Sequence, residues 1–344
     1  MTQHFKPTDF SSPKIDLSNS AIFITGGTGS FGQRLVRKLL RSNRPRRLVI
    51  FSRDELKQSE MIEALREEDQ GTLRFFIGDV RDASRLEMAM REIDIVVHAA
   101  ALKQVPAAEY NPFECIRTNV IGAENVATAA LRNGVKKVVA LSSDKAANPI
   151  NLYGASKLAS DKIFVAANNL SGDIGTQFSV MRYGNVVGSR GSIVPLFRKL
   201  IAEGARELPI TDERMTRFWI TLDQGVDLVL SSLVMMHGGE IFVPKLPSMK
   251  VVDLTHALAP GLPHRIVGIR PGEKLHEVLI PEDDARTTVE YPDRYIIQPS
   301  LSFWRADSHT ANGAKPVAEG FRYSSDSNSE WLDEEGLKVL LDEA

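Results

Sequence analysis

The sequence holds a single cysteine, Cys115, among its 344 residues. One thiol cannot form a disulfide within the chain or a thiolate metal cluster, so we expect no bound metal, and the reducing cytoplasm suits such a chain. Long apolar runs are also missing: no stretch reaches the 18 residues that a membrane span needs. Residues 1–17 are polar and contain two prolines, unlike the apolar core of a signal peptide.

A strong charge of either sign is lacking as well, since 42 basic and 44 acidic residues leave a net charge of −2. A surface for nucleic acid or anionic lipid generally needs a basic excess, so neither partner is predicted, although a local basic pocket can still hold a phosphate. The remaining composition, 43% apolar and 25% charged, is that of an ordinary globular enzyme. The length suits one large core with a smaller lobe.

Short apolar runs alternate with helical patterns over the first half of the chain. Residues 21–25 form an apolar run that ends in glycines, which is typical of a buried parallel strand. The same alternation predicts further strands at 47–51, 73–77, 93–98, 137–141 and 177–183, and helices at 31–40, 55–68, 81–91, 112–133 and 153–169. This order of elements predicts an α/β fold with a doubly wound parallel sheet.

Glycines recur at positions 26, 29 and 32, between the first strand and the first helix. Small residues there let the backbone approach a pyrophosphate, whose charge then faces a helix N-terminus. A glycine triplet alone is a weak signal, but this position predicts a dinucleotide site in a Rossmann-like domain. The residues expected to line the site are Gly26, Thr28, Gly29, Ser30, Phe31 and Gly32.

The end of the second strand distinguishes NADP from NAD. An NAD site usually has an acidic residue there for the ribose hydroxyls, whereas this chain places Ser52 and Arg53 first and Lys57 one helical turn later. Arg53 can pair with a 2′-phosphate, so we predict NADP. The alternative is that Asp54 binds the ribose of NAD and the two cations are solvated. Two further turns are expected to line the cofactor cleft, at Asp79, Val80, Ala99 and Ala101.

After Gly188 prolines and glycines become frequent and the predicted elements shorten, which indicates a second lobe. A helical pattern at 225–236 and a strand at 241–243 still fit the first domain. We therefore expect four parts: an N-terminal extension (1–20), the NADP-binding domain (21–188 with a returning segment at 215–245), a substrate lobe (189–214 and 246–300) and a tail (301–344) with a closing helix at 330–341.

Tyr153 and Lys157 stand four residues apart on a predicted helix, so they share one face. An ammonium close to the phenol favours the phenolate and lowers the tyrosine's pKa from its reference of about 10. Such a tyrosine can remove a hydroxyl proton while a hydride leaves for the nicotinamide. Just before it, Ser143, Asp144 and Lys145 end a predicted strand, at the edge where open α/β sheets bind ligands.

Together these residues resemble the extended short-chain dehydrogenase/reductases over 21–299, and more closely the inverting UDP-N-acetylglucosamine 4,6-dehydratases. The stretches that carry the resemblance lie at 25–32, 52–60, 99–103, 143–149, 182–192, 215–219 and 270–277. It implies NADP as cofactor, UDP-N-acetylglucosamine as substrate and a homo-oligomer. It also implies a product that enters pseudaminic acid biosynthesis for flagellar or surface glycans.

Retaining sugar dehydratases carry Thr-Asp-Glu where this chain has Ser143, Asp144 and Lys145, and lysine there matches the inverting class. By this resemblance Tyr153, assisted by Lys157, takes the 4-hydroxyl proton as C4 gives a hydride to NADP⁺. Lys145 then removes the C5 proton while Asp144 protonates the departing 6-hydroxyl. Lys145 must be neutral for this, and we expect burial and nearby positive charge, Lys157 included, to lower its pKa from about 10.4.

The resemblance also implies a substrate site made of Lys103, Lys145, Asn185, Arg190, Arg217, Arg270 and Glu273. Guanidinium groups bind two oxygens at once, so Arg217 and Arg270 suit the diphosphate, and Glu273 suits a ribose hydroxyl. Asn119 resembles the asparagine that supports the active-site lysine through water. Two alternatives remain open: a nucleotide-sugar 4-epimerase, which needs no Asp–Lys pair, and a catalytically silent NADP-binding regulator.

Overall fold

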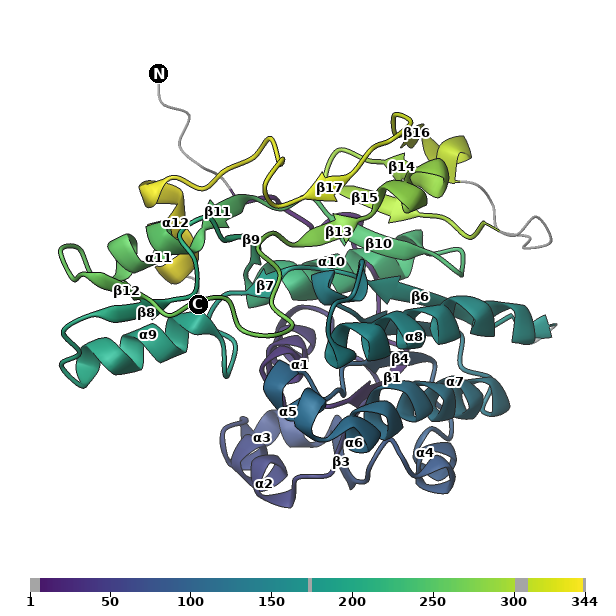
Figure 1. Ribbon diagram of the computed structural model, residues 1–344. Helices are drawn as coiled ribbons and strands as arrows, with labels where there is room; N and C mark the ends of the chain where they lie inside the picture. Colours follow the sequence, from purple (N-terminus) through teal and green to yellow (C-terminus); the bar gives the residue numbers. More distant parts are fainter. Residues whose placement is uncertain (1–6, 173–174, 301–308, 343–344) are drawn as a thin grey trace.

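The computed structural model describes residues 7–172, 175–300 and 309–342, and it consists of a large sheet domain with a smaller lobe at its side (Figure 1). Within these residues ten strands form the main sheet, in the order β16-β14-β15-β10-β6-β5-β4-β1-β2-β3. The seven strands from β10 to β3 run parallel. Their bounds are β1 Ala21–Thr25, β2 Arg47–Ser52, β3 Leu73–Ile77, β4 Ile95–His98, β5 Lys137–Leu141, β6 Gln177–Met181 and β10 Ile241–Pro244.

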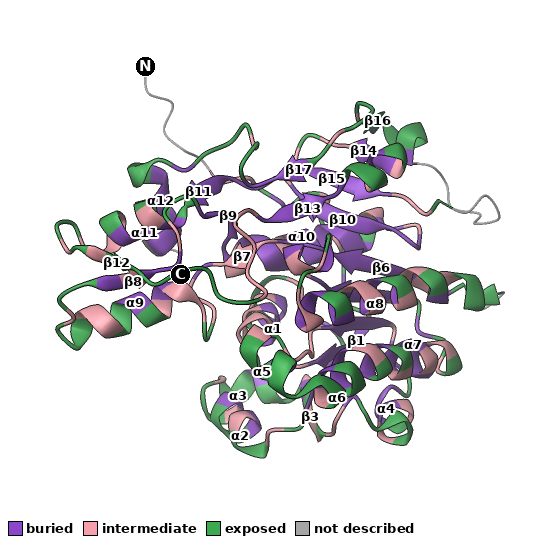
Figure 2. Cartoon of the chain, in the orientation of Figure 1, coloured by how far each residue is buried: buried purple, intermediate pink, exposed green. Residues whose placement is uncertain are grey.

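Helices cover both faces of this sheet, which confirms the predicted α/β, doubly wound class. Helices α1 (Ser30–Ser42) and α10 (Leu222–Met235) pack together on one face, and α4 (Ala83–Ala89), α7 (Gly122–Arg132) and α8 (Leu152–Ala167) pack on the other. Figure 2 shows the strands buried and the outward faces of the helices exposed. No helix of the described chain is both long and apolar enough to cross a bilayer.

Two predicted helices are interrupted. The helix expected at 55–68 divides into α2 (Glu55–Glu63) and α3 (Glu67–Gln70). The helix expected at 112–133 becomes α6 (Pro112–Ile116), a π-helical turn η1 (Arg117–Ile121) and then α7, preceded by α5 (Val105–Tyr110). A single π turn widens the helix and often marks a functional site. Asn119 lies at its centre.

The smaller lobe has an apolar core of its own, built from Phe197, Leu208, Trp219, Leu254 and Leu337 among others. Its elements are β7 (Asn185–Val186), α9 (Ile193–Ala202), β8 (Leu208–Ile210), β9 (Thr216–Ile220), β11 (Ser248–Lys250), α11 (Val251–Leu258) and β12 (His264–Ile266). The closing helix α12 (Glu334–Asp342) packs against α11 and joins this core.

The predicted limits of the substrate lobe differ from the observed strand pairing. Strands β14 (Thr288–Glu290), β15 (Arg294–Ile297) and β16 (Lys315–Pro316) extend the main sheet antiparallel beyond β10, although 246–300 was expected in the lobe and 301–344 in a separate tail. Strand β13 (Val278–Ile280) pairs with β17 (Tyr323–Ser324). The short helical turns are η2 (Asp144–Ala146), η3 (Asn168–Leu170), η5 (Glu282–Thr287) and η6 (His309–Asn312).

Candidate active site

The glycine-rich turn lies at the switch point of the sheet, between β1 and its neighbours β4 and β2. Gly26 has φ +65°, and a Cβ on it would lie 2.9 Å from the backbone of Ala100, in the segment after β4. A Cβ on Gly32 would lie 2.5 Å from Gly27, so both positions admit only glycine. This close packing leaves the N-terminus of α1 open to a cavity, which is the arrangement that accepts a pyrophosphate.

A buried histidine locks the end of β4 to that of β1. Thr25 Oγ1 lies 2.8 Å from His98 Nδ1 and accepts hydrogen bonds from the backbone N–H groups of Ala99 and Ala100, at 3.1 and 3.2 Å. Burial, together with the charge of Lys157, lowers the pKa of His98 to about 3. His98 is therefore a neutral structural residue that fixes the alanine turn.

One cavity of about 780 Å³ brings nearly all the predicted cofactor and catalytic residues together. The cofactor residues along it are Gly26, Thr28, Gly29, Ser30, Phe31, Gly32, Ser52, Arg53, Lys57, Asp79, Val80, Ala99 and Ala101. The predicted catalytic residues along it are Ser143, Asp144, Lys145, Tyr153 and Lys157. Side chains from the ends of β1, β2, β4 and β5 thus face one space.

At the end of this cavity beside β2, Thr28 Oγ1 lies 2.8 Å from Ser52 Oγ. Asp54 caps α2 by accepting from the Lys57 N–H at 3.1 Å, and it also holds the Lys57 ammonium at 2.5 Å. The Arg53 guanidinium is more than half exposed and lies 3.7 Å from Asp79. Asp54 is thus occupied by Lys57, and Arg53 presents a positive charge at the mouth of the cavity.

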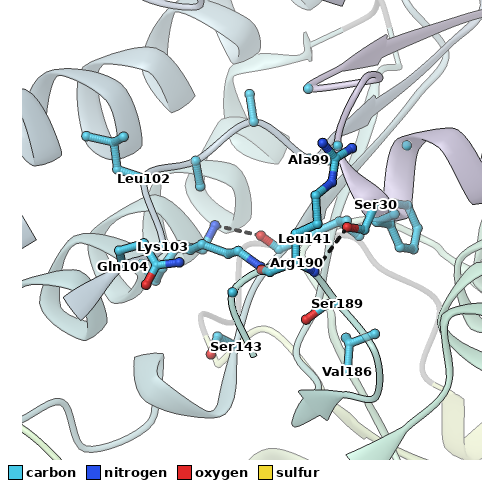
Figure 3. Close-up of a pocket in the computed structure, with 18 of the residues that line it drawn as sticks. Ser30, Ala99, Leu102, Lys103, Gln104, Leu141, Ser143, Val186, Ser189 and Arg190 are labelled. Atoms are coloured by element: carbon cyan, nitrogen blue, oxygen red, sulfur yellow. Dashed lines mark hydrogen bonds between the residues drawn. The ribbon is translucent and has the colours of Figure 1, made fainter. Parts of the chain in front are cut away.

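Arg190, expected to bind substrate, lies beside the glycine-rich turn. Its Nη2 donates to the carbonyl of Thr28 at 3.0 Å, and its backbone N–H lies 3.4 Å from Ser30 Oγ. The ammonium of Lys103 donates to the carbonyl of Arg190 at 3.0 Å, as Figure 3 shows. Burial, with the charge of Arg190, lowers the pKa of Lys103. The two cations join the loops after β4 and β7 across the cavity.

The buried Lys157 is directed at the backbone rather than at the phenol. Its Nζ donates to the carbonyl of Leu141 at 2.6 Å. Burial lowers the pKa of Lys157, although the nearby Asp161 opposes this. Burial raises the pKa of Tyr153 to about 12, against the charge of Lys145 and a hydrogen bond with Ser143. The expectation of a tyrosine tuned by Lys157 is therefore corrected: in this structure the nearby lysine that lowers its pKa is Lys145.

The expected lowering of the Lys145 pKa is also wrong for this structure. Its Nζ lies 3.1 Å from Asp144 Oδ1 and 3.3 Å from Glu277 Oε1. Burial lowers the pKa of Lys145, but the charges of Asp144 and Glu277 outweigh it, so the net pKa is raised. Ser143 donates to Asp144 Oδ1 at 2.7 Å and caps the turn η2, which holds the pair at the cavity wall.

A second cavity of about 210 Å³ adjoins the first and shares Lys145 and Asn185 with it. Arg217, Arg270 and Glu273 line this second cavity. The guanidinium of Arg217, which was expected to bind the diphosphate, donates to carbonyls of its own strand and of the 274–275 segment. Arg270 pairs with Glu273 at 2.8 Å.

Asn119 lies in neither cavity lining. Its side chain is 2% exposed; it accepts from the N–H of Leu102 at 2.8 Å and donates to the Leu102 carbonyl and to Ser156 Oγ, both at 2.9 Å. Its amide is therefore occupied in clamping the loop after β4 to α8. The expected support of the active-site lysine by Asn119 through water stays a prediction.

Two buried residues of the site were missed by the sequence analysis. Asp161 lies one turn beyond Lys157 and contacts Ser142 Oγ at 2.9 Å and Arg182 at 3.3 Å. The spacing of four from Tyr153 to Lys157 to Asp161 was the available signal. The only sign in the sequence that Glu277 belongs to the site was its place in the 270–277 stretch, which carries part of the family resemblance.

Comparison with known proteins places these features in a family. A family model described as "Polysaccharide biosynthesis protein" matches residues 22–299. The UDP-N-acetylglucosamine 4,6-dehydratase (inverting) of Campylobacter jejuni subsp. jejuni serotype O:2 is 59% identical over 93% of this chain and 96% of the relative. The UDP-glucose 4-epimerase of Rickettsia akari is 42% identical over 94% of this chain and 95% of that relative.

Two solved structures have the same fold. Pen from Bacillus thuringiensis superposes with a TM-score of 0.86 at 35% identity, covering 96% of this chain and all of Pen. DesIV, a dTDP-glucose 4,6-dehydratase from Streptomyces venezuelae with NAD and TYD bound, gives a TM-score of 0.66 at 26% identity, covering 82% of this chain and 93% of DesIV. The chain therefore belongs to the polysaccharide biosynthesis protein family, within the extended short-chain dehydrogenase/reductases.

Proposed function

We propose that this protein is an NADP-dependent UDP-N-acetylglucosamine 4,6-dehydratase that inverts C5 of the sugar. The product is UDP-2-acetamido-2,6-dideoxy-β-L-arabino-hex-4-ulose, made as the first step of pseudaminic acid biosynthesis. One observation carries the proposal: Asp144, Lys145 and Tyr153 line one cavity, the first two as an ion pair 3.1 Å apart. The 59% identity to the inverting enzyme of Campylobacter jejuni supports it.

The residues act in sequence on the sugar. Tyr153 takes the proton of the 4-hydroxyl, and Lys157 assists by holding helix α8 to the end of β5 through its hydrogen bond to the Leu141 carbonyl. The glycine turn and the N-terminus of α1 would hold the dinucleotide, whose nicotinamide would supply a hydride acceptor for C4 and a hydride donor for C6 without net consumption. The new C4 carbonyl acidifies the hydrogen on C5. Lys145 removes that hydrogen as a proton, while Asp144 protonates the 6-hydroxyl, which leaves as water. C5 then gains a proton from solvent on the opposite face, which inverts its configuration.

The elimination needs a neutral Lys145 and a protonated Asp144, whereas the resting pair is ionic. Both forms hold the same number of protons, so the transfer of one proton over the 3.1 Å between Nζ and Oδ1 interconverts them. In water the two reference pKa values differ by roughly 6.5 units, which strongly favours the ion pair. Displacing water from the cavity disfavours charges and reduces this difference. Substrate binding thus prepares the base and the acid together.

Several features of the cavity suit NADP. The glycine turn and the N-terminus of α1 form a cradle that a Cβ at Gly26 or Gly32 would fill. At the adenosine end Arg53 carries an exposed positive charge, and Asp54, the alternative partner for an NAD ribose, is bound to Lys57. A guanidinium pairs strongly with a phosphate, so this end favours a 2′-phosphate over a free hydroxyl.

Mass spectrometry after incubation with NADP and UDP-N-acetylglucosamine tests the activity. We expect the nucleotide sugar to lose one water, and Tyr153→Phe to abolish the loss. An unchanged mass with a 4-epimer identified by NMR would instead establish an epimerase. That alternative draws support from the 42% identical epimerase of Rickettsia akari, and an epimerase would use Tyr153 and Lys157 without the Asp–Lys pair. Tight NADP binding without turnover would indicate a silent regulator.

We further propose that the enzyme is cytoplasmic, where nucleotide sugars and NADP are available, and that it works as a homo-oligomer. Light scattering coupled to size-exclusion chromatography would give a mass that is a multiple of 38.0 kDa. A monomer at micromolar concentration would contradict the oligomer.

A further inference from the structure

Glu277 is a buried carboxylate directly before β13, beside the proposed base. Its Oε1 lies 3.3 Å from Lys145 Nζ and 3.7 Å from Arg217 Nε, and its Oε2 lies 3.9 Å from Lys274 Nζ. The side chain is 2% exposed. It contacts the second cavity, and Lys145 separates it from Asp144.

The cations around Glu277 donate their hydrogen bonds to other groups and leave its carboxylate incompletely bonded. Arg217 donates to backbone carbonyls, and Lys274 donates to the carbonyl of Ala147 at 2.5 Å. Oε2 of Glu277 is buried and has no hydrogen-bond partner in the described chain. A buried carboxylate oxygen without a hydrogen-bond partner weakens the folded state, so its presence indicates a role other than stability. Among the ion-pair partners of Glu277, Lys145 is the one with a proposed role in catalysis.

We propose that Glu277 is a positioning residue for Lys145: its carboxylate, 3.3 Å from the ammonium, holds that group at the wall of the active-site cavity. The inference rests on the proposed function, because a reaction that removes a carbon-bound proton needs that amine as a base. The acid/base unit therefore has three members, with Lys145 between two carboxylates.

The charges that face Lys145 define what removing Glu277 would do. They come from η2, α8, β9 and the segment before β13, at Asp144, Tyr153, Arg217, Lys274 and Glu277. Burial and Arg217 favour the neutral amine, whereas the two carboxylates favour the ammonium. Without the carboxylate of Glu277 only Asp144 remains as a close anion. The lysine should then become neutral at a lower pH.

Chemical labelling measures this property without any substrate. The side chain of Lys145 is 27% exposed, and the cavity admits a small reagent. Since only the neutral amine reacts, the rate of acetylation of Lys145 by acetic anhydride against pH, followed by peptide mass spectrometry, reports its ionisation. We expect the inflection in Glu277→Gln to lie about one pH unit or more below that of the native protein. Glu277→Asp, whose charge is one methylene further back, should lie between the two.

A matched control is Glu290→Gln, which removes a carboxylate that pairs with Lys245 at 2.7 Å, outside both cavities. Its inflection should equal that of the native protein. An unchanged inflection in a folded Glu277→Gln variant overturns the proposal. Should that variant not fold, Glu277→Asp decides: a lower inflection supports the proposal, and an equal or higher one overturns it.

Turnover gives a second readout. In Glu277→Gln the acid limb of the kcat profile should move to lower pH in parallel with the labelling, and kcat should fall more than KM rises. Failure of the proposed function is seen separately, as a native protein that releases no water from UDP-N-acetylglucosamine. Unchanged labelling inflections, by contrast, remove only the role of Glu277.

Discussion

The ammonium of Lys157 lies 2.6 Å from the carbonyl oxygen of Leu141, the last residue of β5. Asp144 and Lys145 follow three and four residues later in the chain. Lys157 therefore ties helix α8, which carries Tyr153, to the loop that carries the acid/base pair. Asp161 supplies the buried counter-charge one turn further along α8.

Replacement of Lys157 by methionine should therefore impair catalysis in two ways. It removes a positive charge from the site and releases the loop after β5. We expect kcat for water loss to fall by about 10²–10⁴, the range typical for a general acid–base group and its support. Lys162→Met, on an exposed position of the same helix, is the control. A Lys157→Met variant with native kcat would contradict the anchoring role.

The buried His98 predicts a loss of stability in acid. Its folded-state pKa of about 3 lies below the unfolded value of about 6.5, so the unfolded chain binds the additional proton. Its contribution is complete above pH 6.5 and declines as the pH falls toward the folded value. The melting temperature of His98→Asn should thus depend less on pH between 7 and 4.5 than that of the native protein. His256→Asn, at an exposed position, should keep the native dependence.

Replacement of Arg53 by glutamine tests the cofactor preference. The charged contact with a 2′-phosphate contributes about 1.5–3 kcal/mol, so NADP affinity should fall tenfold or more while NAD affinity stays within twofold. Calorimetric titration of both dinucleotides measures this. Arg66→Gln, outside the cavity, is the matched control. Equal losses for NADP and NAD would show that Arg53 acts on some shared part of the cofactor.

Asn119 should matter first for stability. In Asn119→Leu the N–H and carbonyl of Leu102 lose their side-chain partner, and Ser156 loses a donor. An unsatisfied buried polar group costs about 1–3 kcal/mol, so we expect the free energy of unfolding to fall by at least that amount in urea titrations. A variant of native stability with reduced turnover would instead indicate a catalytic role.

The elements around the cofactor could be predicted because their signals are local. An apolar run, three glycines and a helical pattern identify β1 and α1 within 20 residues, and the bounds agree closely. The chemistry at β5 and α8 was recognisable for the same reason. The pairing of β14, β15 and β16 with the main sheet depends on contacts between distant segments, which no local pattern reveals.

The protonation of the active-site residues could not be predicted from the sequence, because it also depends on contacts between distant segments. The pKa of Lys145 was expected to be lowered by burial and by nearby positive charge, Lys157 included. The charge of Asp144 raises this pKa, and so does Glu277, which lies 3.3 Å away in space but comes from a distant stretch of the chain. Likewise Lys157 shares a helical face with Tyr153, as the spacing predicted, yet a backbone carbonyl determines where its ammonium lies. The spacing of residues on a helix predicts which side chains share a face, but tertiary packing determines which group each side chain contacts.

The most direct test of the central claim is NMR of the product formed from UDP-N-acetylglucosamine in deuterated water. If Lys145 removes the C5 proton and solvent supplies its replacement, the 4-keto-6-deoxy sugar should carry deuterium at C5 in the L-arabino configuration. A product with protium at C5, or with C5 in its original configuration, would contradict the account.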